Sequence, residues 1–114
     1  MNLYLLRHAK SSWESYEDDH ERVLSDRGRK DACTLGEYLR KNNINFENTL
    51  CSSSHRTRET ISIINAVSPH SFDEINYLDS LYHASSNKIK EIIQNYTHKS
   101  LLIVGHNPGI SELI

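Results

Sequence analysis

Short apolar runs alternate along the chain with longer stretches in which apolar residues recur at helical spacing. Each run is short enough to be a buried strand, and the run at 100–104 is the most uniformly apolar. The expected strands are 2–6, 49–52, 72–78 and 100–104. Within 72–78 the alternation of apolar and polar residues is imperfect, so this strand is the least regular of the four.

A helix is expected after each strand, because each interval contains a residue that can cap one. A Ser or Asn side chain at this position accepts a hydrogen bond from a backbone N–H group that has no partner within the helix. The candidate N-caps are Ser25 for a helix over 26–42, Ser54 for one that ends before Pro69, Ser85 or Ser86 for a third, and Asn107 for a last one with Pro108 at its first position.

This alternation predicts an α/β fold, built as a three-layer α/β/α sandwich with a mostly parallel sheet. A chain of 114 residues has room for one hydrophobic core, so residues 1–114 are expected to form a single domain. In parallel sheets, ligands bind outside the carboxyl ends of the strands. The segments expected there are 7–10, 52–56, 79–83 and 105–107, which carry several of the chain's histidines and arginines.

Composition and charge narrow the possible partners. The formal net charge is −2 at pH 7, so no overall positive field attracts nucleic acid or an anionic membrane. No apolar run approaches the ~20 residues of a membrane span, and the N-terminal run is too short for a signal peptide. We therefore expect a cytoplasmic protein without nucleic-acid or membrane partners, in which any attraction for anions is local.

Motif spacing argues against three other kinds of chemistry. The chain has no Gly-x-x-x-x-Gly-Lys-Ser/Thr loop, as nucleotide triphosphate hydrolysis would require. Cys51 and Arg56 have the spacing Cys-x4-Arg rather than the Cys-x5-Arg of cysteine-dependent phosphatases, and no glycine lies between them. The seven histidines include no His-x-His or His-Glu-x-x-His pair, so neither a metal nor another cofactor is expected.

The candidate nucleophile is His8, which directly follows the first strand and stands beside Arg7. A lone histidine in this position is more often structural, so its neighbour matters. An arginine at a buried strand end needs an anionic partner, and its guanidinium group matches two phosphate oxygens. Nearby arginines also favour the neutral imidazole, which is the nucleophilic form.

Two further residues are expected at the same edge of the sheet. Arg56 falls in the first turn of a helix, where a positive charge is unfavourable unless it pairs with an anion beside the free N–H groups. His106 lies in a strand-to-helix turn flanked by glycines, where the backbone can approach a ligand closely. Each residue alone could be structural, but their convergence with Arg7 and His8 predicts an anion pocket.

Three segments together resemble the histidine phosphatase superfamily: LRHAKSSW at 6–13, SSSHRTRET at 52–60 and VGHNPG at 104–109. The full first motif, with LSDRG at 24–28 and LYHA at 81–84, is similar to the small SixA-like branch of phosphohistidine phosphatases. The resemblance implies a phosphoglycerate mutase-like fold. It also implies that His8 becomes transiently phosphorylated, that Arg7, Arg56 and His106 hold the phosphoryl oxygens, and that Asn107 binds substrate beside them.

The expected activity is removal of a phosphoryl group from phosphohistidine or another small phosphorylated substrate, with a phosphorylated protein or a small phosphate as partner. Many relatives carry an acid in the loop after the third strand that protonates the leaving group. Asp79 and His83 lie in that loop here, and neither clearly matches the motif of such an acid, so the acid is not assigned. Relatives continue past 109 with more helix and a further strand, so this chain is expected to be C-terminally short. Two alternatives remain: a phosphate-binding or regulatory module without turnover, and a phosphoglycerate mutase-like transferase.

Overall fold

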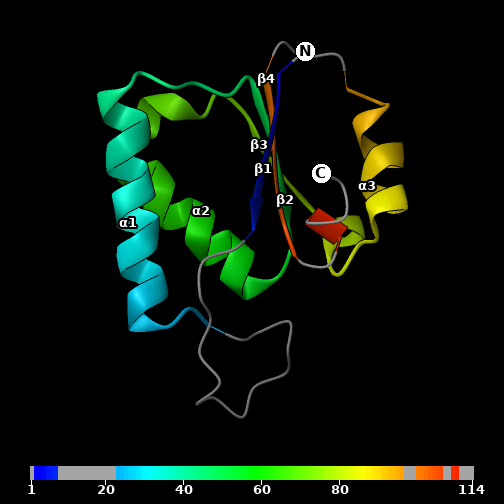
Figure 1. Ribbon diagram of the computed structural model, residues 1–114, viewed down its shortest axis with the longest axis horizontal. Helices are drawn as coiled ribbons and strands as arrows, with labels where there is room; N and C mark the ends of the chain where they lie inside the picture. The colour runs from blue at the N-terminus through cyan, green and yellow to red at the C-terminus, as the bar shows by residue number, and fades with distance from the viewer. Residues whose placement is uncertain (1, 8–22, 97–99, 107–108, 111–114) are drawn as a thin grey trace.

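The computed structural model describes residues 2–7, 23–96, 100–106 and 109–110, which form alternating strands and helices (Figure 1). The strands of this part of the chain form one parallel sheet in the order β1-β4-β2-β3. Their bounds are β1 (Asn2–Arg7), β2 (Asn48–Ser52), β3 (Ile75–Leu78) and β4 (Ser100–Gly105).

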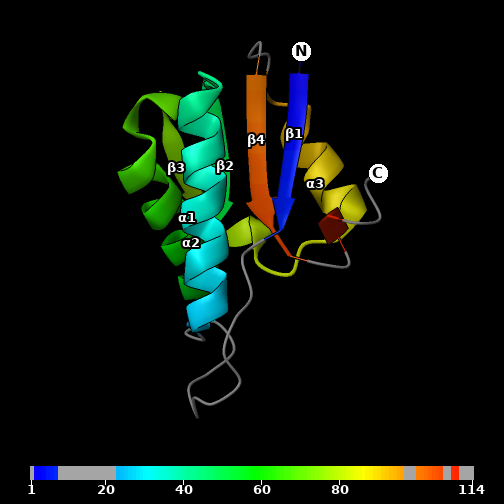
Figure 2. The same cartoon turned by 60° about the vertical axis from the view of Figure 1, so that its left-hand side comes forward.

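Helices cover both faces of the sheet (Figures 1 and 2). Helices α1 (Asp26–Lys41) and α2 (His55–Val67) pack together on one face, and α3 (Ser86–Ile93) lies on the other. The short 3-10 segments η2 (Pro69–Ser71) and η3 (Asp79–Leu81) flank β3. The predicted three-layer α/β/α sandwich with a parallel sheet is therefore confirmed. Among the described helices, none is long and apolar enough to cross a membrane.

The predicted caps of these three helices are also confirmed. The side chains of Ser25, Ser54 and Ser85 each accept a hydrogen bond from the backbone N–H group three residues further on. The predicted cap Asn107 lies outside the described residues.

The third strand is shorter than the sequence predicts, because only Ile75–Leu78 pairs with β2. Phe72 instead forms an isolated bridge with Phe46, and the two rings pack with their centroids 5.7 Å apart. The apolar character of this residue therefore reflects core packing just before the strand begins, which accounts for the imperfect alternation of the segment.

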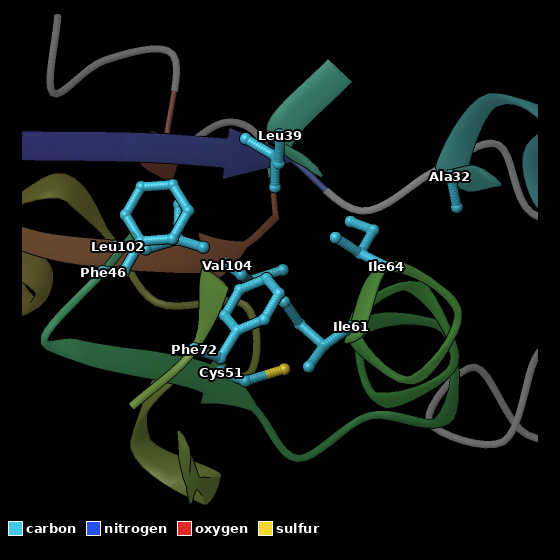
Figure 3. Packing of buried hydrophobic residues seen from close by; sticks show 9 residues of the cluster. All are labelled: Ala32, Leu39, Phe46, Cys51, Ile61, Ile64, Phe72, Leu102 and Val104. Carbon is cyan, nitrogen blue, oxygen red and sulfur yellow. The ribbon is translucent and has the colours of Figure 1, made fainter. Parts of the chain in front are cut away.

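The core consists of two clusters, one on each face of the sheet. Leu102 and Val104 of β4 join the cluster beneath α1 and α2, which Figure 3 shows. Leu101 and Ile103 join the cluster beneath α3. Because β4 is buried on both faces, nearly every position of the strand has to be apolar.

The strand order determines which chain segments meet at the carboxyl edge of the sheet. Strand β4 lies between β1 and β2, with Arg7 in register with Gly105 and Cys51 in register with Val104. The carboxyl end of β4 therefore lies between those of β1 and β2.

Candidate active site

The structure brings together two of the predicted site residues, Arg56 and His106. Arg56 is the second residue of α2, and His106 directly follows β4. A guanidinium nitrogen, Nη2 of Arg56, lies 3.2 Å from Nδ1 of His106. Both residues are buried, with exposed fractions of 1% and 3%. Residues 50 positions apart in the sequence thus form one buried polar contact at the carboxyl edge of the sheet.

This contact assigns the tautomer of His106. A guanidinium group can only donate hydrogen bonds, so Nδ1 of His106 has to accept and carries no proton. The proton of the neutral ring is then on Nε2, which lies 2.8 Å from the hydroxyl oxygen of Ser52 and donates to it. The ring is thus held between one donor and one acceptor, with its lone pair directed at Arg56.

The turn between β2 and α2 supports the acceptor side of this arrangement. The hydroxyl of Thr57 donates to the backbone carbonyl of Ser52 at 2.6 Å, and it lies 2.7 Å from the hydroxyl of Ser54. All three side chains are buried. Sequence reasoning gave Ser52 no role, although its position at the end of a strand and four residues before Arg56 was a usable signal.

The start of α2 has a charge distribution that favours an anion. Its first turn contains no acidic residue, so the positive end of the helix dipole and the Arg56 guanidinium reinforce one another. A buried guanidinium group is costly without an anionic or hydrogen-bonding partner. The arrangement is therefore suited to holding an oxyanion next to Arg56 and His106.

Two aromatic residues of the loop after η3 complete this part of the site. The Tyr82 ring stacks on the His106 ring, with the centroids 5.5 Å apart and the planes at 26°. The guanidinium carbon of Arg56 lies 5.9 Å from the centre of the same Tyr82 ring, within cation–π distance. The His83 ring lies 5.1 Å from the His106 ring and is exposed to solvent. Asp79, the other candidate acid of this loop, begins η3 and is also exposed.

Close backbone packing fixes this loop against the turn after β4. A Cβ atom added to Gly109 would lie 2.0 Å from the carbonyl oxygen of Ala84. The sequence suggested that the glycines of this turn allow close approach to a ligand. At Gly109 the close approach is to the protein's own backbone, and it holds the segment that carries Tyr82 and His83 beside His106.

The remaining predicted site residues are Arg7, His8 and Asn107, and the structure describes only Arg7. Arg7 is the last residue of β1 and is exposed, so the argument that it sits at a buried strand end is wrong: β1 lies at the edge of the sheet. The burial argument applies to Arg56 instead. His8 and Asn107 lie outside the described residues, so their roles stay predictions.

Cys51 does not take part in chemistry at this edge. It is fully buried, and burial raises the pKa of its thiol from 9.0 to about 12. A cysteine nucleophile has to be a thiolate, so this environment agrees with the rejection of a cysteine-dependent phosphatase. Within the described residues, no group of three or more His, Cys, Asp or Glu side chains could hold a metal ion.

The sequence and the structure match known proteins over most of the chain. The sequence profile of the histidine phosphatase superfamily (branch 1) matches residues 3–82. An uncharacterized protein from Mycobacterium leprae is 37% identical over 116 residues, a match that covers 95% of this chain and 68% of the relative. The chain spans about two thirds of the length of its mycobacterial relatives.

Solved structures match the fold. A crystal structure from Agrobacterium tumefaciens, assigned to the phosphohistidine phosphatase SixA, has a TM-score of 0.89 at 29% identity and covers 97% of this chain and 72% of that one. A phosphoglycerate mutase from Plasmodium falciparum has a TM-score of 0.62 at 18% identity and covers 95% of this chain and 69% of that one. The predicted phosphoglycerate mutase-like fold is therefore confirmed.

Proposed function

Because the chain belongs to the histidine phosphatase superfamily, we propose that it is a phosphatase that acts on phosphohistidine or another small phosphorylated substrate. The observation that carries the proposal is the buried contact between Arg56 and His106 at the positive end of α2. These are two groups that can hold phosphoryl oxygens, and they lie where parallel sheets bind ligands. The similarity to a SixA structure supports phosphohistidine as the substrate class.

The proposed reaction proceeds through two displacements at phosphorus. A ring nitrogen of His8 attacks the phosphorus atom, forms a P–N bond and breaks the bond to the leaving group. A water molecule then attacks the phosphohistidine, which releases inorganic phosphate and regenerates His8. Arg7, Arg56 and His106 stabilise the negative charge on the phosphoryl oxygens in both steps, and each well-placed donor contributes on the order of 3–4 kcal/mol.

The test is phosphate release from a phosphohistidine-containing protein and from p-nitrophenyl phosphate. The wild type is expected to release phosphate and to form an acid-labile phosphoenzyme, whereas His8→Ala is expected to do neither. His70→Gln is the matched control, because His70 is an exposed histidine in η2 at the opposite end of the sheet. Phosphate release by His8→Ala at the wild-type rate would rule out the mechanism.

The same assay separates the proposal from its alternatives. Binding of inorganic phosphate by a wild type that leaves every substrate intact would overturn the proposal in favour of a phosphate-binding module. Transfer of the phosphoryl group to an added alcohol, at the expense of release to water, would overturn it in favour of a transferase.

A further inference from the structure

His83 lies beside the candidate site but is not one of the buried residues that we propose bind phosphate. Its ring lies 5.1 Å from that of His106, yet its side chain is exposed to solvent. Arg56 and His106 are both buried, so a phosphoryl group that contacts them has its leaving group on the solvent side. His83 therefore stands where a bound substrate passes from the buried pair to solvent.

The backbone of His83 is held in an unusual conformation. Its φ angle is 51°, in the left-handed region that residues other than glycine rarely adopt. Asn43 is the other described residue besides glycine with positive φ, and it follows the end of α1. Asn and His both adopt this conformation more often than most residues, so the position of His83 beside His106 matters more than the angle alone. The neighbours of His83 are fixed by a hydrogen bond from Ala84 to Leu81 and by the packing of Gly109 on Ala84. An uncommon conformation that the surroundings maintain next to buried polar groups is often found in functional residues.

We propose that His83 is the catalytic acid and base of the phosphatase reaction, an inference that rests on the proposed function. In the first step the protonated ring of His83 gives its proton to the leaving atom as the bond from that atom to phosphorus breaks and the P–N bond to His8 forms. The leaving atom is the oxygen of a phosphoester or the imidazole nitrogen of a phosphohistidine. In the second step the neutral ring takes a proton from the water that attacks phosphorus. The balance is one phosphoester or phosphohistidine and one water converted to one alcohol or histidine and one inorganic phosphate, with His8 and His83 returned to their initial state.

Residue type and position both favour His83 over Asp79. Histidine is the side chain that most readily gives and takes a proton near neutral pH. Asp79 belongs to the same loop but lies at the start of η3, four residues before the histidine that packs beside His106. Tyr82, between them in the chain, covers His106 and Arg56 rather than the solvent side.

The experiment compares leaving groups that need protonation to different degrees. The variant is His83→Asn, because asparagine tolerates positive φ and cannot act as an acid. For phenyl phosphate, whose leaving group is basic, kcat/KM is expected to fall about 100-fold. For p-nitrophenyl phosphate, whose leaving group needs little help, the loss is expected to be several-fold smaller. The inhibition constant of inorganic phosphate is expected to stay unchanged.

Asp79→Asn serves as the matched control in the same loop and is expected to lower the two rates equally or not at all. A leaving-group-selective loss in Asp79→Asn but not in His83→Asn would overturn the assignment in favour of the aspartate. An equal loss on all substrates with weaker phosphate inhibition would make His83 a phosphate-binding group and overturn it as well. Absence of phosphate release by the wild type would overturn the proposed function, and the role of His83 with it.

Discussion

Replacing Ser52 by alanine tests whether the hydrogen bonds around His106 set the chemistry of the site. Ser52→Ala removes the acceptor of the Nε2–H group and leaves the Arg56 contact at Nδ1 in place. Without this acceptor, no hydrogen bond from Nε2–H to Ser52 stabilises the tautomer that carries its proton on Nε2. A proton on Nδ1 would then face a guanidinium group that also only donates.

The magnitude follows from the burial of both partners. Ser52 is 0% exposed and His106 is 3% exposed, so water cannot replace the lost acceptor without rearrangement. Leaving a buried donor unsatisfied costs about 1–3 kcal/mol. The Ser54 hydroxyl lies 3.5 Å from Nε2, too far for a good hydrogen bond. A middle value of about 2 kcal/mol is the expected loss of unfolding free energy. Because Ser52 accepts from Nε2 in both the free and the phosphate-bound state, only the extra strength of its bond to the protonated ring, about 1 kcal/mol, lowers kcat/KM, by about 5-fold.

Two measurements check this prediction. Phosphate release gives kcat/KM, and the ¹⁵N chemical shifts of histidine-labelled protein report which ring nitrogen carries the proton. In the wild type without phosphate, His106 is expected to be protonated on Nε2 alone. Bound phosphate is expected to place an oxygen between Nδ1 and Arg56. Nδ1 then takes up a proton and donates to this oxygen, to which Arg56 also donates, while Ser52 accepts from Nε2 in both states.

Ser68→Ala is the matched control for the loss of a buried serine hydroxyl. Ser68 is 3% exposed, and its hydroxyl lies 2.6 Å from that of Ser71 at the opposite end of the sheet. This variant is expected to lose a similar free energy of unfolding and to keep its kcat/KM. Equal activity losses in the two variants would refute the reasoning, and so would a wild-type His106 that carries its proton on Nδ1.

Three further predictions concern residues that are buried or closely packed. Gly109→Ala is expected to lower the unfolding free energy by about 1–3 kcal/mol in urea titrations, since its Cβ would lie 2.0 Å from the Ala84 carbonyl oxygen. In native protein at about pH 8, iodoacetamide is expected to modify exposed Cys33 but not Cys51, whose pKa burial raises to about 12, as mass spectrometry can show. Ile61→Ala is expected to lower the unfolding free energy by about 2–5 kcal/mol, because Ile61 is fully buried in the core, and calorimetry would show it.

Most of the fold could be predicted from the sequence, because burial dictates residue type in a simple way. Strand β4 is covered on both faces, so its continuous apolar run predicts a strand within one residue of the observed end. Serine caps likewise mark where α1, α2 and α3 begin, since a free backbone N–H group needs an acceptor nearby. The segment around Phe72 was mispredicted, because packing on Phe46 demands an apolar residue without demanding a strand.

The site was predictable only as far as it follows from strand ends. Arg56 and His106 both follow the carboxyl ends of parallel strands, which the sequence predicts, and they come into contact because β2 and β4 are neighbours, which it does not. The contributions of Ser52 and Tyr82 could not be predicted in this way. They depend on ring orientation and on the path of the chain through short turns, which hydrophobic periodicity does not encode.

The strand order also explains why His106 is buried whereas Arg7 is exposed. β4 is an inner strand, so His106 is shielded from water. β1 is an edge strand of the described sheet, and Arg7 at its end is exposed. In the structure the Arg56–His106 pair carries one positive charge, because the ring that accepts from Arg56 is neutral. A phosphoryl group brings about two negative charges, and proton uptake at Nδ1 would raise the charge of the pair to match. The acceptor supplied by Ser52 holds the ring at Nε2 while the phosphoryl oxygen replaces the Arg56 contact at Nδ1.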